Sequence, residues 1–322
     1  TGYDQADQPI PPYALIPTIM PHGGMLSTAE DVGKFLLAFL NGGAAPGGAR
    51  ILSEASVAEM GIYRHALHPL LPETTYGFEA PFQLPLAGSS DDVLVKLGDL
   101  PGSSVMLLVI PEQKTGVFLV SNKSGTLRDL FYAGFMATFF PAYTMPAELP
   151  ASGPAPSGEL AKLEGVYMDL RAKSLVYRVE ANEDGTLTLS DALVGPRILR
   201  QVDNGLFVDN LTQRFTAFGT EDESGTVYMR EPYLNPLGYA RKSDAPVGYA
   251  DVDADGAYAP YILALQSLGH YPNEPGQRFG PERPVTRAEL VYDLLRISGL
   301  DGSKAETYAF ADVAGHPLAP YV

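Results

Sequence analysis

The chain of 322 residues contains no cysteine, so it can form neither disulfides nor thiolate metal sites. Positive charge is also scarce, because 22 Lys and Arg residues stand against 38 Asp and Glu residues, for a formal net charge of −16. Binding to nucleic acid requires a basic surface, and this balance excludes that class of function. The acidic excess is explained by solubility without any cationic partner.

Long hydrophobic runs are missing as well. The longest nearly apolar stretch covers residues 130–142, whereas a membrane-spanning helix needs about 20 residues. We therefore expect a buried helix there and no transmembrane segment in this chain. Hydrophobic residues make up 45% of the sequence, and a chain of this length has room for two or three domains.

The first region, residues 1–145, carries helix and strand signals in alternation. Ser27-Thr28-Ala29-Glu30 has the pattern of a capping box, with Ser27 as the cap, and Asn41-Gly42 ends the apolar periodicity that follows. Ser53 is expected to cap a second, shorter helix. Strands are predicted at residues 93–97, 103–110 and 117–121, and a later helix should cover the sheet with Leu127, Leu130, Phe131, Gly134 and Phe135.

Two further regions follow a linker predicted at residues 146–158, which is rich in proline and serine. Residues 159–243 contain short β runs separated by turn signals, which predicts a small antiparallel barrel or sandwich. From residue 248 to 322 the chain repeats itself, and we place one repeat at about 249–300 and a truncated second one from about 308. The overall prediction is a multidomain α+β protein with an antiparallel sheet and helices, then a β barrel, then helical repeats.

The repeat in the last region is carried by two elements. Tyr249-Ala250-Asp251-Val252 returns as Phe310-Ala311-Asp312-Val313, and Ala259-Pro260-Tyr261-Ile262 returns as Ala319-Pro320-Tyr321-Val322. Between them, Thr286-Arg287-Ala288-Glu289 opens an amphipathic helix.

The order of several short motifs in the first region resembles the β-lactamase, penicillin-binding protein and related esterase superfamily. The segment Lys96-Leu97-Gly98-Asp99-Leu100-Pro101-Gly102 matches the third active-site motif of that family, a K/H-x-G triplet. The supporting matches run from residue 23 to residue 102 and are Gly23 to Val32, Leu40-Asn41-Gly42-Gly43, Ile51-Leu52-Ser53, Tyr76-Gly77-Phe78 and Pro101-Gly102.

This resemblance implies roles for the residues of the triplet. Lys96 would orient the substrate by its charge, Gly98 would let substrate lie close to the strand, and the backbone amide of Asp99 would donate to an oxyanion. Leu97 and Tyr76 would contact substrate. The alternative is that Lys96 is only a solvated lysine on a strand.

The family also requires an upstream S-x-x-K helix and a Y-x-N loop. No S-x-x-K occurs in the sequence, so we expect the chain to be the C-terminal part of a longer enzyme whose missing segment supplies the nucleophile. The literal Lys114-Thr115-Gly116 is expected at a hairpin tip and not in a cleft. His65 and His68 are expected on a surface or cleft rim, with Pro69 arguing for a loop there.

The last region resembles the S-layer homology (SLH) domain, through the aromatic-x-Asp-Val start, the Pro-Tyr segments, Phe279-Gly280-Pro281 and the Thr286–Glu289 motif. Such domains attach proteins to anionic secondary cell-wall polymers. Arg287 would then bind an anionic group with Thr286 beside it. The alternative, that Arg287 and Glu289 only brace the helix, carries equal weight for Arg287 and more for Glu289.

Two functions remain open. One is a cell-surface serine hydrolase of a Gram-positive-type bacterium that forms an acyl-enzyme on a cell-wall peptide, a β-lactam or an ester. The other is a non-catalytic binding protein displayed on the wall. No cofactor and no metal are predicted in either case, and the middle region is similar only at fold level to the lipocalin-like domains that follow such hydrolases.

Overall fold

The computed structural model describes residues 1–11, 23–81, 93–123, 125–144, 157–234, 238–253, 256–300 and 315–321. Compact units are formed by Thr1–Ser152 with Val202–Ala217 and Pro232–Leu237, and by Gly153–Gln201 with Phe218–Glu231 and Gly238–Val322. Within the described ranges, no helix is long and apolar enough to cross a bilayer. Almost the whole predicted linker, and the second Phe310–Val313 element, lie outside the described residues.

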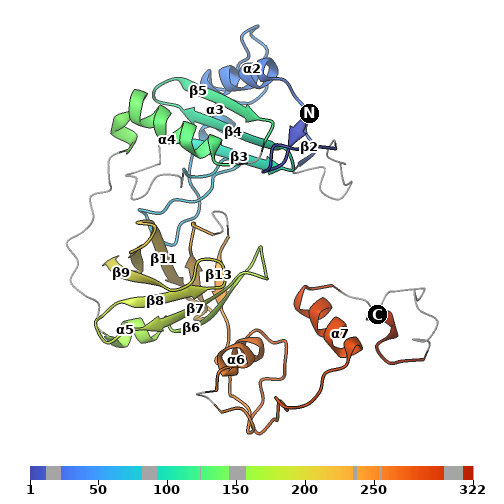
Figure 1. Ribbon diagram of the computed structural model, residues 1–322. Helices are drawn as coiled ribbons and strands as arrows, with labels where there is room; N and C mark the ends of the chain where they lie inside the picture. The colour runs from blue at the N-terminus through green and yellow to red at the C-terminus, as the bar shows by residue number, and fades with distance from the viewer. Residues whose placement is uncertain are drawn as a thin grey trace. The chain divides into compact units, whose positions relative to one another are not determined.

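The first region is built around an antiparallel sheet of β3 (Leu94–Leu100), β4 (Ser103–Ile110) and β5 (Thr115–Ser121), in that order (Figure 1). All three predicted strands are confirmed. β3 continues to Leu100 because Pro101-Gly102 forms a tight turn, with Gly102 at a φ of +70°. A separate ribbon joins β1 (Gly2–Tyr3) to β2 (Pro9–Ile10).

One face of the sheet is covered by α2 (Ala29–Leu40), which is followed by α3 (Glu54–Met60). The cap of α2 is Thr28, whose hydroxyl accepts from the Asp31 amide at 3.2 Å, so the predicted cap at Ser27 is wrong by one residue. The predicted end at Asn41 and the Ser53 cap of α3 are confirmed. The buried core on this face consists of Leu36, Phe39, Leu40, Phe78, Leu94 and Val109.

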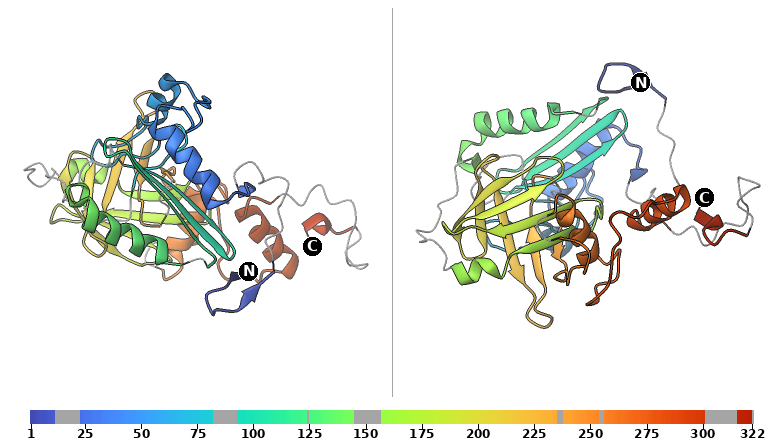
Figure 2. Two further views of the ribbon diagram at one scale, coloured as in Figure 1. Left: turned by 90° about the horizontal axis from the view of Figure 1, so that it is seen from above. Right: turned by 60° about the horizontal axis from the view of Figure 1, so that its bottom comes forward.

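The opposite face is covered by α4 (Leu127–Phe139), which leads into the 3-10 turn η2 (Pro141–Thr144) (Figure 2). Tyr132 and Met136 are its buried side chains, and they pack on Met106, Leu108 and Ile110. Phe131 and Phe135 join them as predicted, but Leu127 and Leu130 are exposed, so the predicted buried face was rotated. The apolar residues of this helix outnumber the positions that one face can bury.

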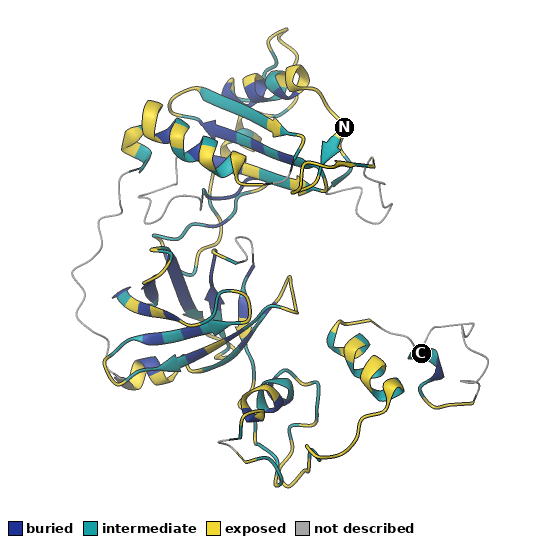
Figure 3. Cartoon of the chain, viewed as in Figure 1, coloured by how far each residue is buried: buried dark blue, intermediate teal, exposed yellow. Residues whose placement is uncertain are grey.

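The middle region is a closed antiparallel barrel, which decides between the predicted barrel and sandwich. Its strands are β6 (Gly165–Asp169), β7 (Val176–Ala181), β8 (Leu187–Asp191), β9 (Arg197–Asp203), β10 (Leu206–Asp209), β11 (Phe215–Thr220), β12 (Val227–Arg230) and β13 (Ala240–Lys242). A short helix, α5 (Ser157–Ala161), precedes it. Along β7 to β9 buried and less buried residues alternate, as expected for strands with one face inside (Figure 3).

Strands β9 and β13 were not predicted. In β9 the inward positions include Arg197, which breaks the apolar alternation that marks a half-buried strand. β13 has only three residues, Ala240–Lys242, and is recognisable as a strand only by its pairing with Met168 and its neighbours.

The last region contains α6 (Ala259–Ser267), α7 (Arg287–Ile297) and the 3-10 turn η5 (Ala319–Tyr321). Ala259-Pro260-Tyr261 opens α6, and the second copy, Ala319-Pro320-Tyr321, also forms a helical turn. The ring of Tyr321 stacks edge-on against Tyr292 of α7 at 4.8 Å.

Candidate functional site

Strand β3 presents alternate residues to opposite sides of the sheet. Lys96 and Gly98 lie opposite Leu107 and Val105 of β4, on the face that α2 covers. Leu97 packs with the cluster beneath α4 on the other face. Lys96 and Gly98 of the predicted triplet therefore share one face.

A groove of about 580 Å³ lies on the α2 face beside Lys96. Its walls come from the loop before α2, the first turns of α2, and the outer ends of the three strands. The lining residues are Met25, Leu26, Ser27, Ala29, Asp31, Val32, Phe35, Lys96, Leu97, Ser103, Val105, Leu107, Phe118 and Val120. Most are apolar, and Lys96 and Asp31 are the charged side chains among them.

The ammonium group of Lys96 is held by a carboxylate. Lys96 Nζ contacts Glu79 Oε1 in an ion pair and also donates to the Leu97 carbonyl at 3.0 Å. The Glu79 side chain is only 6% exposed, whereas that of Lys96 is 50% exposed. An ammonium has three N–H donors, and Glu79 and the carbonyl occupy two of them.

Glu79 itself is fixed by the backbone of β3. Its amide donates to the Val95 carbonyl at 2.7 Å, and its carbonyl accepts from the Val95 amide at 3.0 Å. Tyr63 adds hydrogen bonds from its hydroxyl to the carbonyls of Glu79 and Val93, at 3.3 and 2.6 Å. Sequence reasoning missed Glu79 because an isolated bridge between distant residues leaves no local pattern.

The same bridge fixes where the amide of Asp99 points. Since Val95 exchanges both its backbone hydrogen bonds with Glu79, the amides of alternate residues, Leu97 and Asp99, face the same edge of β3 and not β4. The Asp99 amide, which is the predicted oxyanion donor, thus faces the edge of β3 that carries Glu79. Glu79 is also the residue that holds the Lys96 ammonium.

The carboxylate of Asp99 is held elsewhere, by Arg128 at the start of α4. Arg128 Nη1 donates to Asp99 Oδ2 at 2.7 Å, and the arginine side chain is 12% exposed. Arg128 also contacts Ser104 at 3.4 Å and Asp129 at 3.2 Å. This set of contacts fixes the end of β3 without directing the Asp99 carboxylate at the groove.

The other predicted residues differ in their surroundings. A Cβ on Gly98 would lie 3.0 Å from Val105 Cγ2, so packing within the sheet also restricts this position to a small residue. Leu97 borders the groove, although its side chain packs beneath α4 on the opposite face of the sheet. Tyr76 is not among the described lining residues: it is exposed, and the Arg64 guanidinium lies 5.4 Å from its ring centroid.

Lys114 sits in the turn between β4 and β5, as predicted, with a φ of +47°. Its Nζ donates to the Leu40 carbonyl at 3.0 Å. His65 is exposed, in line with the expected surface or cleft-rim position, whereas His68 is buried, with 8% of the residue exposed. Its Nδ1 accepts from the Leu70 amide at 3.1 Å, so Nε2 carries the hydrogen directed at Asp203 Oδ2, 3.2 Å away.

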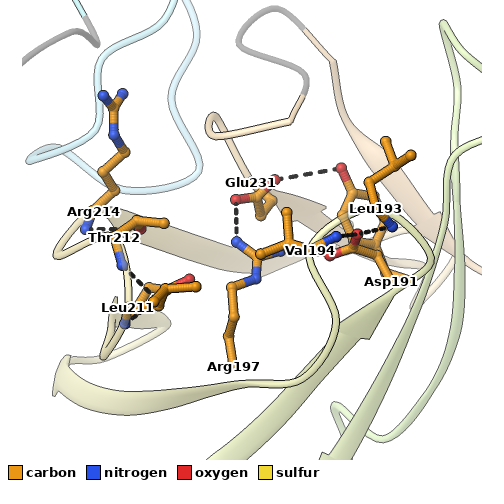
Figure 4. Close-up of polar contacts among 10 residues, drawn as sticks. Asp191, Leu193, Val194, Arg197, Leu211, Thr212, Arg214 and Glu231 are labelled. Atoms are coloured by element: carbon orange, nitrogen blue, oxygen red, sulfur yellow. Dashed lines mark hydrogen bonds and ion pairs between the residues drawn. The ribbon is translucent and has the colours of Figure 1, made fainter.

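A second charged cluster is enclosed in the barrel (Figure 4). Arg197 pairs with Asp191 at 3.0 Å and with Glu231 at 2.9 Å, and none of the three side chains is more than 3% exposed. Asp191 also accepts from the amides of Leu193 and Val194, each at 2.8 Å. The Tyr177 hydroxyl donates to Glu231 at 3.4 Å, and burial together with the nearby Glu231 carboxylate raises the pKa of that hydroxyl.

In the last region, Thr286 and Glu289 form a complete capping box at the start of α7. The Thr286 hydroxyl accepts from the Glu289 amide at 3.2 Å and donates to the Glu289 carboxylate at 2.9 Å. The backbone hydrogen bond from Thr286 and the ion pair with Arg283 hold the pKa of Glu289 at about 2. Arg287, at the first helical position, is exposed and makes no side-chain hydrogen bond or ion pair within the described ranges.

The repeated aromatic-x-Asp-Val element has a structural reason. Asp251 accepts from the amides of Phe279 and Gly280 at 2.8 and 2.9 Å, and these bonds, the Phe279 bond first, lower its pKa. The Tyr249 ring lies 5.5 Å from that of Phe279. The element therefore ties the start of the repeat to the loop before α7.

Comparison with known families agrees with this layout. Residues 1–135 match the family model described as Beta-lactamase, and residues 248–291 match the S-layer homology domain. The chain carries a β-lactamase domain and an SLH domain. The eight-stranded barrel lies between them in the sequence. This pairing indicates a hydrolase-like protein associated with the cell surface, and the SLH domain implies binding to a cell-wall polymer.

No match is found among curated proteins. Among solved structures, a crystal structure of SurE with D-Leu is 18% identical with a TM-score of 0.42, and covers 59% of this chain and 44% of that one. A second SurE crystal structure is 19% identical with a TM-score of 0.40, and covers 59% and 42%. The chain thus spans less than half the length of either of these two proteins. The low TM-scores and sequence identities add nothing to the fold assignment.

Proposed function

We propose that the β-lactamase domain is part of a serine hydrolase that forms an acyl-enzyme on a cell-wall peptide, a β-lactam or an ester. The observation that carries this proposal is the arrangement of β3. The Lys96 ammonium borders an apolar groove, and the Asp99 amide faces the strand edge at which that ammonium is anchored.

In the proposed reaction, a serine hydroxyl from an upstream segment attacks the substrate carbonyl carbon and passes its proton to a neighbouring base. The resulting oxyanion accepts a hydrogen bond from the Asp99 amide, while Lys96 orients the substrate. Collapse expels the leaving group with a proton and leaves an acyl-serine, which water then hydrolyses. The chain's own residues orient the substrate and stabilise charge, and Glu79 holds Lys96 in position.

The second candidate function is a non-catalytic binding protein, and the 322 residues contain no S-x-x-K. The chain by itself should therefore turn over neither nitrocefin nor p-nitrophenyl esters. Activity above a heat-inactivated control that disappears in Lys96→Ala would contradict this expectation.

The two candidate functions can be distinguished by an experiment on the longer protein that includes the upstream segment. If it is a serine hydrolase, brief incubation with a p-nitrophenyl ester or nitrocefin should add the mass of the acyl group, as measured by intact-protein mass spectrometry. Absence of both the adduct and turnover, in folded protein with an intact S-x-x-K, would favour the binding protein.

We also propose that the SLH domain binds an anionic secondary polymer of a Gram-positive-type wall, with Arg287 as the contacting cation. An exposed guanidinium at the first position of a helix offers charge-assisted hydrogen bonds beside unpaired backbone amides. Thr286 would shape the site through the cap, since its hydroxyl is already engaged by Glu289.

Arg287→Ala should weaken binding to walls that retain the polymer by about 1.5–3 kcal/mol, the range for a hydrogen bond to a charged group. Sedimentation of the protein with such walls measures it, and walls extracted of polymer give the background. Arg171→Ala, an exposed arginine of the barrel, is the matched control. Equal binding by Arg287→Ala and wild type would remove Arg287 from the contact.

A further inference from the structure

We propose that Glu79 neutralises Lys96, so that the groove takes an uncharged acyl group in preference to a carboxylate. This inference rests on the proposed function, and it selects an uncharged ester or amide from the substrate classes left open there. Glu79 is a positioning residue in this account, because it acts on the substrate through Lys96.

The positive charge of Lys96 is offset by the carboxylate of Glu79. The Glu79 carboxylate contacts the Lys96 ammonium and is 6% exposed, so it is screened far less by solvent than a surface carboxylate would be. A ligand carboxylate approaching Lys96 would also be repelled by the negative charge of Glu79, which contacts the same ammonium. The attraction between Lys96 and the ligand carboxylate is offset by repulsion from Glu79. A negative charge on the ligand therefore adds little binding free energy.

Lys96 keeps one N–H donor beyond those bound by Glu79 and the Leu97 carbonyl. Glu79 and the Leu97 carbonyl engage two of the three N–H groups of Lys96, and the Lys96 side chain is half exposed beside the groove. The third N–H can donate to a neutral carbonyl oxygen, which needs a directed hydrogen bond and no net positive charge.

The walls of the groove are largely apolar. Apart from Lys96, the charged side chain of the described lining is Asp31, a second carboxylate, which pairs with Lys34 at 2.9 Å. The remaining surface is formed largely by Val32, Val105, Leu107 and other apolar side chains. Apolar walls around a neutralised cation fit an apolar acyl chain ending in an uncharged amide or ester.

The test uses a pair of probes that differ only in charge, N-hexanoylglycinamide and N-hexanoylglycine. Their affinities for the complete chain are measured from methyl NMR shifts of Val105 and Leu107. Wild type should bind the amide more tightly. Glu79→Gln should move the amide-to-carboxylate affinity ratio toward the carboxylate by at least about tenfold, since it removes the charge at nearly constant volume. Glu112→Gln, in the exposed β4–β5 turn, should leave the ratio unchanged.

Several results would overturn the proposal: tighter binding of the carboxylate by wild type, a ratio unchanged in folded Glu79→Gln, or no shifts with either probe at millimolar concentration. If Glu79→Gln fails to fold, the wild-type preference decides by itself. Because this binding needs no nucleophile, a failed result here leaves the acyl-enzyme proposal to its own mass-spectrometric test, and the converse also holds.

Discussion

Buried carboxylates of this protein pair with cations in two very different settings. Glu79 is buried, but its partner Lys96 is half exposed beside a groove. In the barrel, Arg197 lies between Asp191 and Glu231, and all three side chains are inaccessible. The same chemistry therefore produces a cation that can meet a ligand in one region and a closed network in the other.

The difference shows why a buried charge alone does not indicate a site. In the barrel network Asp191 also accepts from two backbone amides and Glu231 from Tyr177, so both carboxylates have partners besides Arg197. At Lys96 two N–H donors are engaged, and the side chain is half exposed. Exposure of one partner, and not burial of the pair, separates the two cases.

The largest predicted effect breaks the closed network. Arg197→Met leaves Asp191 and Glu231 buried without their cation, and it should destabilise the protein by about 3–5 kcal/mol in urea unfolding. Arg178→Met removes a half-exposed pair with Glu180 on the same barrel and should cost less than about 1 kcal/mol. Similar losses in the two variants would mean that the enclosed network has no special role in stability.

A smaller effect is expected from the edge of the same network. Tyr177→Phe removes one hydrogen bond to Glu231 and should lower the free energy of unfolding by about 1 kcal/mol. The ratio of affinities for N-hexanoylglycinamide and N-hexanoylglycine should not change, because Tyr177 lies in the barrel network and the groove lies beside Lys96. A changed ratio would show that the two settings are coupled.

The smallest effect concerns an exposed ion pair, at the start of α7. The folded-state pKa of Glu289 is about 2, below its usual value of 4.5, so the ionised carboxylate stabilises the fold. That contribution is complete above about pH 4.5 and is lost as the pH falls toward about 2. Glu289→Gln should therefore lower the helix signal of the SLH domain at neutral pH and remove its acid dependence in this window. An unchanged acid profile would contradict the capping role.

Elements whose signals are local could be predicted from the sequence. The three strands of the sheet, the Ser53 cap and the turn at Lys114 follow from apolar alternation and turn residues. The α2 cap was predicted at Ser27 because adjacent Ser27 and Thr28 both suit a cap, and only the geometry selects Thr28.

Long-range pairs could not be predicted. Lys96 was identified from its motif, but its partner Glu79 is 17 positions away, and the two meet only because Glu79 bridges to Val95. Arg197 lies 34 positions from Glu231, and as an inward arginine it also concealed strand β9. Ion pairs formed by folding leave no periodicity in the sequence.

The proposed active site lies at Lys96 on β3 and not at the literal Lys114-Thr115-Gly116. The most direct measurement is kcat/KM in the longer protein with its upstream segment, compared between Lys96→Ala and Lys114→Ala. We predict a loss of at least about tenfold for Lys96→Ala, in line with removal of a group that orients substrate, and near wild-type turnover for Lys114→Ala. The reverse ranking, in two variants that fold equally well, would contradict the account.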